Sequence, residues 1–261
     1  MTRNDDARGG ERAPLVTTII PSYDHARYVG NAIESVLAQD YPNVELIVID
    51  DGSSDGSHDV IRAYAHDPRV TAILNTENRG QSFVFNRALE ASTGAFVQLL
   101  PSDDWYLPHK TRLQVERFLA SDAQTGVVYA RGRRFFEDTG ETHDVRYPVT
   151  PPFRREVFDV APMDETLRAE GEAVYVRIAL HYEFAHVDEF VAVMRDHSYN
   201  VGASTHLMYD EAERCWAKFF ARPDIPEHIR ALEPVPMRRP HRTKGMQFIG
   251  EERDFAMGRR A

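Results

Sequence analysis

Two adjacent aspartates, Asp103 and Asp104, stand just after an apolar run, 95–100, has ended. Two unpaired acids do not normally follow a buried strand, because like charges side by side cost free energy unless a cation offsets them. The pattern is typical of a strand that delivers carboxylates to the edge of a sheet, where a divalent cation and a phosphate-bearing ligand can bind. An acidic turn that caps the next helix would use the same residues, so this stretch alone leaves both interpretations open.

Three other polar clusters follow predicted strands in the same way. They are the segments 22–24, 50–57 and 78–81. In sheets of parallel strands, ligands bind at the carboxyl ends of the strands. We therefore expect these three clusters and the segment 102–104 to share one edge, which favours a binding site over four unrelated turns.

The elements that must position these clusters alternate between strands and helices. Continuous β-branched and apolar runs predict strands that are buried on both faces, and apolar residues at helical spacing predict amphipathic helices. This alternation predicts an α/β fold, with a Rossmann-like, mostly parallel central sheet, right-handed crossovers and helices on both faces. The predicted strands are 15–20, 44–49, 70–74 and 95–100, and the predicted helices are 26–39, 60–65 and 82–91.

The pattern changes beyond Pro108. A helix and a strand are followed by a predicted antiparallel hairpin and by a proline-rich connection, 147–162, which we expect to be irregular. We therefore expect small antiparallel and helical additions to the sheet. The predicted elements are a helix at 109–120, strands at 126–130, 133–136, 141–147 and 183–196, and helices at 172–181, 207–220 and 225–232.

The composition excludes several classes of protein. The net charge of −10 and the pI near 5.6 argue against a nucleic-acid partner bound through its phosphates. The single cysteine, Cys215, rules out an intrachain disulfide framework and is compatible with a reducing compartment. No apolar run approaches the length of a transmembrane segment, and the first residues are polar and charged rather than a signal peptide.

These features predict a soluble, cytoplasmic protein. We expect a disordered tail over 1–13, one domain over 14–200, further helices over 201–236 and a flexible basic tail over 237–261. The arginines of the last segment could contact anionic lipid at a membrane surface, and a solvated tail is the other interpretation.

The stretches PSYDHARYVGNAIESVLAQDYPNVELIVIDDGSSDGS and NRGQSFVFNRALEASTGAFVQLLPSDD resemble the family 2 glycosyltransferases, which have the GT-A fold. The resemblance runs from residue 15 to about 130 in the order and spacing of the family, and it resumes more weakly over 164–197. It implies that 14–130 is the half that binds a nucleotide-sugar and that 131–200 is the acceptor half.

The resemblance assigns roles to the donor-binding residues. It implies that Pro21, Ser22, Tyr23 and Asp51 hold the base of a nucleoside-diphosphate sugar, such as a UDP-sugar. Tyr23 offers a flat face for stacking, and the Asp51 carboxylate can accept a hydrogen bond from a base N–H. It also places Arg79 and Gly80 on the loop that passes over the donor.

Two of these assignments have simpler alternatives. Arg79 could pair with the diphosphate, and an exposed turn arginine is an equally good interpretation. Asp51 could instead cap the turn that follows it.

A metal site is implied in the same way. The leaving diphosphate carries a negative charge, which Mn²⁺ or Mg²⁺ held by a carboxylate can offset. We assign Asp104 to the metal and Asp103 to the ribose or the metal. Arg195 and His197 resemble the Arg-x-His element of the family, which approaches the diphosphate and the metal, although a histidine after a strand is often structural.

The catalytic base is where the sequence departs from the family. Inverting members carry a Glu-Asp pair seven and six residues before a helical arginine, and here Glu170 and Gly171 precede Arg177 in that frame. Either Glu170 or Glu172 is chemically competent to deprotonate an acceptor hydroxyl. Alternatively, both are acids in a first helical turn that only stabilise the N-terminus of the helix.

Three functions remain open. The first is a metal-dependent inverting glycosyltransferase in polysaccharide biosynthesis, which uses a carbohydrate, lipid-linked or small-molecule acceptor. The second is a catalytically degenerate nucleotide-sugar-binding protein that acts as a partner or regulatory subunit. The third, a nucleotidyltransferase, is the weakest, because the first predicted strand is not followed by a glycine-rich phosphate loop with a lysine.

Overall fold

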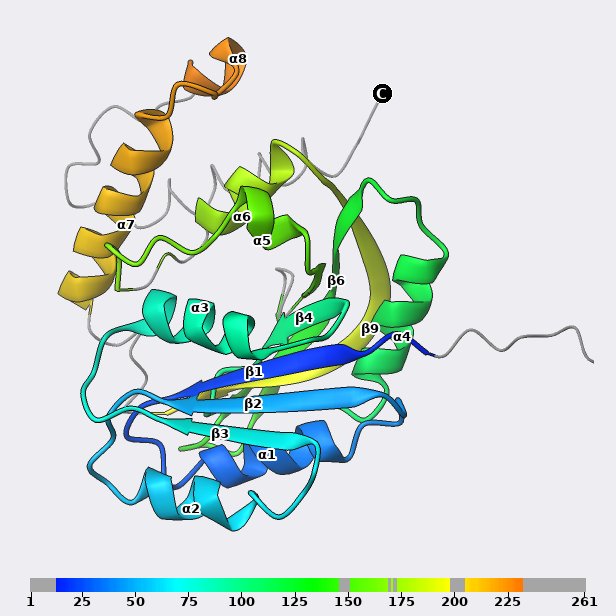
Figure 1. Cartoon of the computed structure of the whole chain (residues 1–261), viewed down its shortest axis with the longest axis vertical. Helices are drawn as coiled ribbons and strands as arrows, with labels where there is room; N and C mark the ends of the chain where they lie inside the picture. Colours follow the sequence, from blue (N-terminus) through cyan, green and yellow to red (C-terminus); the bar gives the residue numbers. More distant parts are fainter. Residues whose placement is uncertain (1–12, 146–150, 169, 171–172, 198–204, 232–261) are drawn as a thin grey trace, which may run out of the picture.

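The computed structural model describes residues 13–145, 151–168, 170, 173–197 and 205–231 (Figure 1). Within these residues nine strands form one sheet, in the order β3-β2-β1-β4-β8-β6-β9-β5, with β7 paired to β6. The predicted tails over 1–13 and 237–261 lie outside these residues, except for Ala13.

The first half of the sheet is parallel and matches the prediction closely. Strands β1, β2 and β4 are buried, because helices cover both faces of this part of the sheet. The strands are β1 (Val16–Ser22), β2 (Val44–Asp50), β3 (Val70–Leu74) and β4 (Phe96–Leu99), and the helices are α1 (Val29–Leu37), α2 (Ser57–Ala63) and α3 (Gln81–Ala91).

Neighbouring residues of one strand serve the two opposite cores. Ile19 belongs to the core under α3, together with Phe85, whereas Ile20 belongs to the core under α1, together with Ile33. This division follows from the alternation of side chains along a strand. The two helical layers hold the strands from both sides, so the carboxyl ends of β1, β2 and β4 stay in register.

The second half of the sheet is mixed. Strand β6 pairs with β9 in parallel, and β8 lies antiparallel between β4 and β6. The further elements are β5 (Trp105–Tyr106), α4 (Lys110–Leu119), β6 (Thr125–Phe136), β7 (Thr142–Asp144), β8 (Pro152–Arg154), α5 (Val157–Val160), α6 (Ala173–Ala179), β9 (Glu183–Asp196), α7 (Thr205–Phe220) and α8 (Glu227–Arg230).

Two predictions for this half were wrong. The connection 147–162 was expected to be irregular, but it contains β8 and α5. Strand β8 is only 3 residues long and begins at a proline, a position that strands tolerate, so its local sequence carries little signal. The strands predicted at 126–130 and 133–136 are one continuous strand, β6, which bends through register shifts around Arg131.

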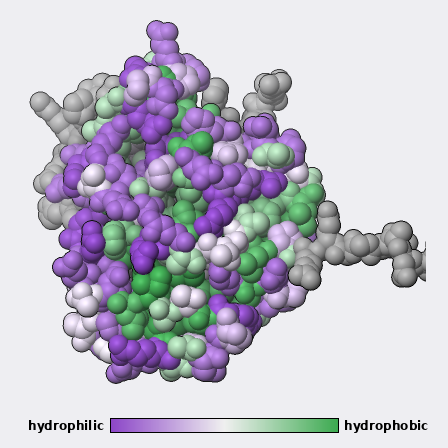
Figure 2. Space-filling view, viewed as in Figure 1, coloured by the Kyte–Doolittle hydropathy of each residue, from purple (hydrophilic) through white to green (hydrophobic). Residues whose placement is uncertain are grey.

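The edge of the parallel half is only partly covered. On the face shown in Figure 2, hydrophobic residues gather over the region of β2 and β3. Val70, Ala72, Ile73 and Leu74 of the edge strand β3 are half-buried. Among the described helices, none combines the length and the hydrophobicity that crossing a membrane requires.

Candidate functional site

The four polar clusters predicted at the strand ends lie together and are joined by hydrogen bonds. The loop after β1 bonds to the loop after β2, because Asp24 N donates to Ser53 Oγ at 2.8 Å. Asp51 accepts hydrogen bonds from the turn before α3, and His25 bonds to the segment after β4. The prediction of a single polar edge is therefore confirmed.

Asp51 fixes the turn that precedes α3. Its two carboxylate oxygens accept hydrogen bonds from Arg79 N at 2.9 Å and Gly80 N at 2.8 Å. Gly80 has a φ of +93°, and a Cβ at this position would lie 3.1 Å from the Cα of Arg168. Glycine is needed here for both reasons, namely its positive φ and the close approach of another backbone segment. Asp51 thus fixes the turn at Arg79 and Gly80, which the sequence predicts to pass over the donor.

Besides Asp51, three residues were predicted to hold the base, and they differ in exposure. Tyr23 is 46% exposed, so its ring is open to a stacking partner. Ser22 is buried, and its backbone carbonyl accepts a hydrogen bond from Asp51 N at 2.8 Å. Pro21 is half-buried at the end of β1. Tyr23 is therefore the side chain of this group that a ligand can reach directly.

Arg79 lies across an aromatic ring at the surface. The centre of its guanidinium is 3.7 Å from the centroid of the Phe83 ring, in the first turn of α3. This contact orients the Arg79 side chain, which is exposed to solvent. It is compatible with both sequence interpretations, an anchor for the diphosphate and an exposed turn arginine.

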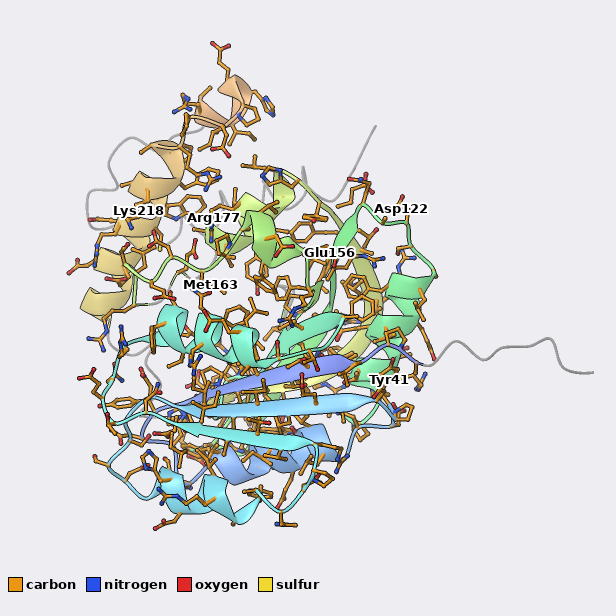
Figure 3. The ribbon with its side chains drawn as sticks, viewed as in Figure 1. Tyr41, Asp122, Glu156, Met163, Arg177 and Lys218 are labelled. Carbon is orange, nitrogen blue, oxygen red and sulfur yellow. The ribbon has the colours of Figure 1, made fainter. Side chains whose placement is uncertain are left out.

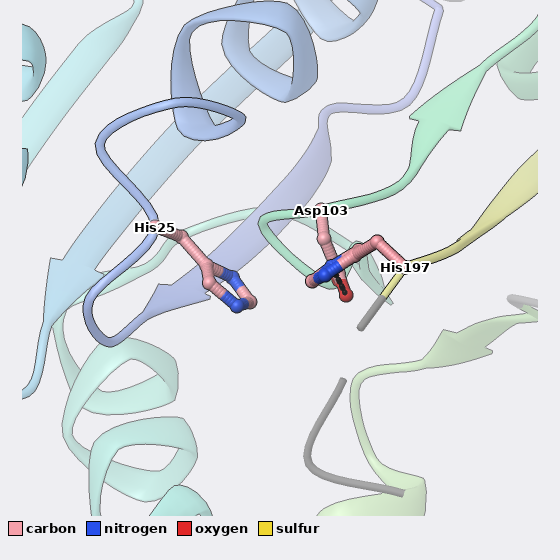
Figure 4. Close-up of side chains that lie close together, drawn as sticks. All are labelled: His25, Asp103 and His197. Carbon is pink, nitrogen blue, oxygen red and sulfur yellow. Dashed lines mark hydrogen bonds and ion pairs between the residues drawn. The ribbon is translucent and has the colours of Figure 1, made fainter. Parts of the chain in front are cut away.

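His25, Asp103 and His197 converge at the centre of the edge (Figure 4). Each offers one ligand atom, and the three atoms lie within 4.8 Å of one another. His197 Nε2 is 3.2 Å from Asp103 Oδ2, and both residues are nearly buried, with exposures of 8% and 9%. The sequence predicted Asp103 and His197 but missed His25, although its position just after a predicted strand-end cluster could have drawn attention to it.

Two contacts orient the His25 ring. Its Nδ1 lies 2.7 Å from Ser102 Oγ, and its backbone N donates to Ser57 Oγ at 3.1 Å. Burial lowers the pKa of His25, with the carboxylate of Asp103 opposing that effect. The lowered pKa favours the neutral imidazole, which keeps a lone pair for a cation.

Asp104 has surroundings very different from those of Asp103. Its Oδ1 accepts a hydrogen bond from Arg195 N at 2.8 Å, which ties the loop after β4 to the end of β9. Burial, and after it the neighbouring Asp103 carboxylate, raise the pKa of Asp104 well above its usual value. The structure therefore brings Asp103, rather than Asp104, to His197.

Arg195 is enclosed in a polar and aromatic frame. Its Nε donates to the backbone carbonyl of Asp103 at 3.0 Å, and its guanidinium lies 3.5 Å from the Glu137 carboxylate. The same guanidinium lies 5.1 Å from the ring centroid of Tyr28 and 4.8 Å from that of Trp105. In this arrangement Arg195 holds the Asp103 segment in place from behind.

Tyr28 connects this frame to the histidines. Its hydroxyl donates to Glu137 at 2.9 Å, and its ring centroid lies 4.5 Å from that of His197. His25 packs edge-on against the same ring, at 5.8 Å between centroids. The orientations of both imidazoles are thus set by packing as well as by hydrogen bonds.

The three converging side chains fit a divalent cation. Neighbouring ligands at about 2.1 Å from an octahedral ion lie about 3 Å apart, and His197 Nε2 and Asp103 Oδ2 are 3.2 Å apart. One carboxylate oxygen and two imidazole nitrogens form a donor set that binds divalent metals. The packing against Tyr28 and the bond to Ser102 provide the outer contacts that usually orient metal-binding histidines.

Of the two predicted bases, Glu170 has a carboxylate with fixed partners. Its Oε1 is 2.6 Å from Arg177 Nη2, and its Oε2 accepts a hydrogen bond from Asp164 N at 3.0 Å. Its side chain is 4% exposed. This geometry is that of an acid that fixes the start of α6. Glu172 lies outside the described residues.

Glu170 borders a cavity of about 260 Å³ between α6, α7 and the segment before α6. Figure 3 labels Arg177 of α6 and Lys218 of α7, which both line it. Among the described residues its lining contains none of the three side chains that converge around Asp103. The lining residues are Asp164, Leu167, Glu170, Ala173, Arg177, Cys215, Lys218, Phe219 and Arg222.

A family model described as "Glycosyl transferase family 2" matches residues 17–181, which is more than half of the chain. An uncharacterized glycosyltransferase of Nostoc sp. is 40% identical over 115 residues, which are 44% of this chain and 35% of that protein. A putative teichuronic acid biosynthesis glycosyltransferase of Bacillus subtilis is 38% identical over 104 residues, which are 40% of this chain and 41% of that protein.

The succinoglycan biosynthesis protein ExoO of Rhizobium meliloti is 37% identical over 117 residues, which are 45% of this chain and 33% of that protein. The chain thus spans less than half of the length of each of these three relatives.

Solved structures share the fold. The mannosyltransferase PcManGT from Pyrobaculum calidifontis, in complex with GDP-Man and Mn²⁺, superposes with a TM-score of 0.63 at 20% identity, over 95% of this chain and 73% of that one. S. aureus TarS 1–349 in complex with UDP gives a TM-score of 0.63 at 16% identity, over 84% and 69% of the two chains. The expected α/β fold of the GT-A type is confirmed, with a sheet that is mixed in its second half.

Proposed function

Because the chain belongs to glycosyl transferase family 2, we propose that it transfers a sugar from a nucleoside-diphosphate sugar to an acceptor hydroxyl. One observation carries the proposal. The exposed Tyr23, the Asp51-held loop and the converging His25, Asp103 and His197 share one edge of the sheet. That edge offers a stacking surface and a cation-binding set, which are the two features that a nucleotide-sugar requires.

The base and the diphosphate would be held by different parts of the edge. We propose that the base stacks on Tyr23 beside Pro21 and Ser22, with Asp51 positioning the loop around it. Arg79 and Gly80 would then border the diphosphate. Arg79 is exposed, so its guanidinium can leave the Phe83 ring and bind a phosphate there.

For the metal, we propose that Asp103 and His197 bind Mn²⁺ or Mg²⁺. When bound, the cation would offset the negative charge of the leaving diphosphate. Asp104 and Arg195 would support this pair indirectly, because both hold the segment that carries Asp103.

We propose that the acceptor hydroxyl attacks the anomeric carbon opposite the diphosphate, so the configuration is inverted. Glu170 and Glu172 remain the candidate bases. If Glu170 serves, it has to release Arg177, to which it is bound at 2.6 Å. The names of two relatives, which refer to teichuronic acid and succinoglycan biosynthesis, favour a carbohydrate acceptor. We further propose that this acceptor is free or lipid-linked and that transfer takes place in the cytoplasm.

Residues 14–130 carry most of the proposed donor site, and we propose that 131–200 form the acceptor side. Arg195 and His197 cross this division, because β9 returns to the edge after β6. The proposed division therefore predicts that truncation before β9 (Glu183–Asp196) would remove the proposed metal ligand His197 from the donor site.

Calorimetry and a turnover assay test the proposal. The full chain is titrated with UDP-linked and GDP-linked hexoses in the presence of Mn²⁺, and release of nucleoside diphosphate is then measured with a panel of sugar acceptors. We expect one nucleotide class to bind and release to depend on the acceptor, with an NMR spectrum of the product showing the inverted anomer. If no nucleotide-sugar binds, the proposal is wrong, whereas binding without release across a broad acceptor panel supports a partner protein that has lost catalysis.

A further inference from the structure

His25 stands at the centre of the polar edge, on the loop between β1 and α1. That loop bears Tyr23 two residues earlier. The Asp103 and His197 side chains come from the far side of the edge, after β4 and after β9 (Figure 4). An aspartate and a histidine alone leave most of the positions around a divalent ion to the ligand and to water. A third side chain changes which ions the site prefers.

The geometry around His25 is that of a metal ligand. Its ligand atom lies within 4.8 Å of those of Asp103 and His197, whereas opposite ligands of one octahedral ion are about 4.2 Å apart. The upper limit of 4.8 Å is close to this spacing, so the three atoms are near enough to share one cation. Because Ser102 Oγ lies 2.7 Å from Nδ1, the other ring nitrogen, Nε2, is the one left for a cation.

The contacts behind the ring favour this orientation. A histidine that binds a metal usually gives its second nitrogen to an oxygen acceptor, which fixes the tautomer. The Ser102 hydroxyl, 2.7 Å from His25 Nδ1, can accept this bond when Nδ1 carries the proton, and Ser102 adjoins Asp103 in the chain. The backbone of His25 is also anchored, because its N–H donates to Ser57 Oγ at 3.1 Å.

We propose that His25 is a third protein ligand of the cation, so that the site binds a transition-metal ion such as Mn²⁺ in preference to Mg²⁺. Imidazole nitrogen suits transition metals, whereas Mg²⁺ takes carboxylate, phosphate and water oxygens and retains its waters. Two imidazoles and one carboxylate are therefore a poor set for Mg²⁺. The inference rests on the metal site of the proposed function and identifies the class of ion for it.

Direct metal binding tests the inference without any need for turnover. The full chain is freed of metal by chelation and titrated by calorimetry with Mn²⁺, Co²⁺ or Mg²⁺ alone. We expect Mn²⁺ and Co²⁺ to bind at least about tenfold more tightly than Mg²⁺. His25→Ala should lower the Mn²⁺ and Co²⁺ affinities by about tenfold or more and the Mg²⁺ affinity far less, since the loss of even an outer contact of a ligand costs about tenfold.

Electron paramagnetic resonance adds a readout that a structural role of His25 would not change. With Mn²⁺ bound, the nitrogen couplings should correspond to two imidazoles in the unsubstituted protein and to one in His25→Ala. His25→Gln is the second variant, because its amide can still bond to Ser102 while providing a poor metal ligand. His66→Ala is the matched control, since His66 is exposed and bonds to Ala63 O, and it should change neither affinity nor couplings.

Asp103→Ala separates the two levels of the argument. If it leaves Mn²⁺ binding unchanged, the metal site of the proposed function is itself wrong. If it abolishes binding while both His25 variants keep the affinity, the couplings and the Mn²⁺ preference of the unsubstituted protein, the metal site stands and the role of His25 is wrong. Loss of selectivity in the His25 variants, with Asp103→Ala inactive in binding, confirms both.

Discussion

Acidic side chains at the strand-end edge and acidic side chains at the start of α6 meet different neighbours. Asp103 faces two imidazoles within 4.8 Å, and its Oδ2 lies 3.2 Å from His197 Nε2. Glu170 faces Arg177 at 2.6 Å and accepts a hydrogen bond from Asp164 N. Both carboxylates are nearly buried, with residue exposures of 9% and 7%, so burial alone does not distinguish them.

The difference lies in whether the neighbouring side chain can give up its contact with the carboxylate. An imidazole can bind a metal ion through a ring nitrogen, so a carboxylate beside two of them can exchange their contact for a shared cation. A buried guanidinium keeps its charge, and its carboxylate cannot leave without stranding it. The first arrangement is suited to binding, and the second is suited to holding structure.

The largest effect is expected for Asp103→Ala. If this carboxylate holds the cation that offsets the diphosphate charge, its loss removes several kcal/mol of transition-state stabilisation. We expect kcat/KM for release of nucleoside diphosphate to fall by about 1000-fold or more. Asp59→Ala is the control, because Asp59 is an exposed acid on α2. A loss of kcat/KM of less than about tenfold in Asp103→Ala would mean that Asp103, like Glu170, has a structural role rather than a role in binding the cation.

Glu170→Ala should affect stability rather than only the rate. It leaves Arg177 buried without its carboxylate, which costs about 3–5 kcal/mol in the free energy of unfolding. Urea denaturation measures this loss. Glu116→Ala is the control, because Glu116 forms an exposed pair with Arg112, and its loss should cost about 1 kcal/mol or less. A stable but inactive Glu170→Ala protein would instead make Glu170 the base.

Gly80→Ala should disturb the edge itself. The substitution forces a side chain into a φ of +93° and to within 3.1 Å of the Arg168 backbone. We expect a loss of about 1–3 kcal/mol in the free energy of unfolding and a weaker binding of UDP or GDP, because Asp51 can no longer hold the turn.

Gly140→Ala separates these two effects. Gly140 has a φ of +72° but open space around its Cβ position, so strain is its main consequence. We expect a smaller loss of stability and unchanged nucleotide binding. Equal nucleotide affinities in both variants would show that the turn before α3 does not contribute to the site.

Lys110 is a buried ionisable side chain whose partners, unlike those of Asp103 and Glu170, are uncharged amides. Its Nζ donates to the amide oxygens of Gln98 at 2.6 Å and Gln114 at 2.8 Å, above the ring of Tyr106. Burial lowers the pKa of Lys110 well below its usual value. The folded protein then binds fewer protons than the unfolded chain between that lowered pKa and about 10.5, so stability rises with pH over this window.

Lys110→Met should remove this dependence. The free energy of unfolding of the unsubstituted protein, minus that of the variant, should rise by up to about 1.4 kcal/mol per pH unit within the window. Denaturation curves at pH 7 to 10 measure the difference. Parallel pH profiles for the two proteins would mean that Lys110 is accommodated as a charged group.

The parallel half of the fold could be predicted from the sequence, because each of its elements carries its own periodic pattern. Strands β1 to β4 and helices α1 to α4 follow from such patterns. Strands β5 and β8 could not be predicted, since 2 and 3 residues hold no period and their pairing is decided by distant partners.

The candidate site was predictable in place but not in detail. The strand-end clusters placed it, whereas the division of labour between Asp103 and Asp104 depends on where β9 ends. Arg195 and His197 come from that strand end, about 90 residues further along the chain. Arg195 N bonds to the Asp104 carboxylate, and His197 Nε2 contacts the Asp103 carboxylate. The position of His25 just after the 22–24 cluster was a signal of place, but its role could not be assigned, since its partners come together only in three dimensions.

The central claim is that a divalent cation and a nucleoside diphosphate bind together at the strand-end edge, with Asp103 and His197 as ligands. Anomalous X-ray diffraction from crystals of the full chain soaked with Mn²⁺ and UDP or GDP tests it most directly. We predict one manganese peak within bonding distance of Asp103 Oδ2 and His197 Nε2, next to the diphosphate. A nucleotide bound at this edge without a peak there, or a manganese ion held by Asp104 instead, would contradict the account.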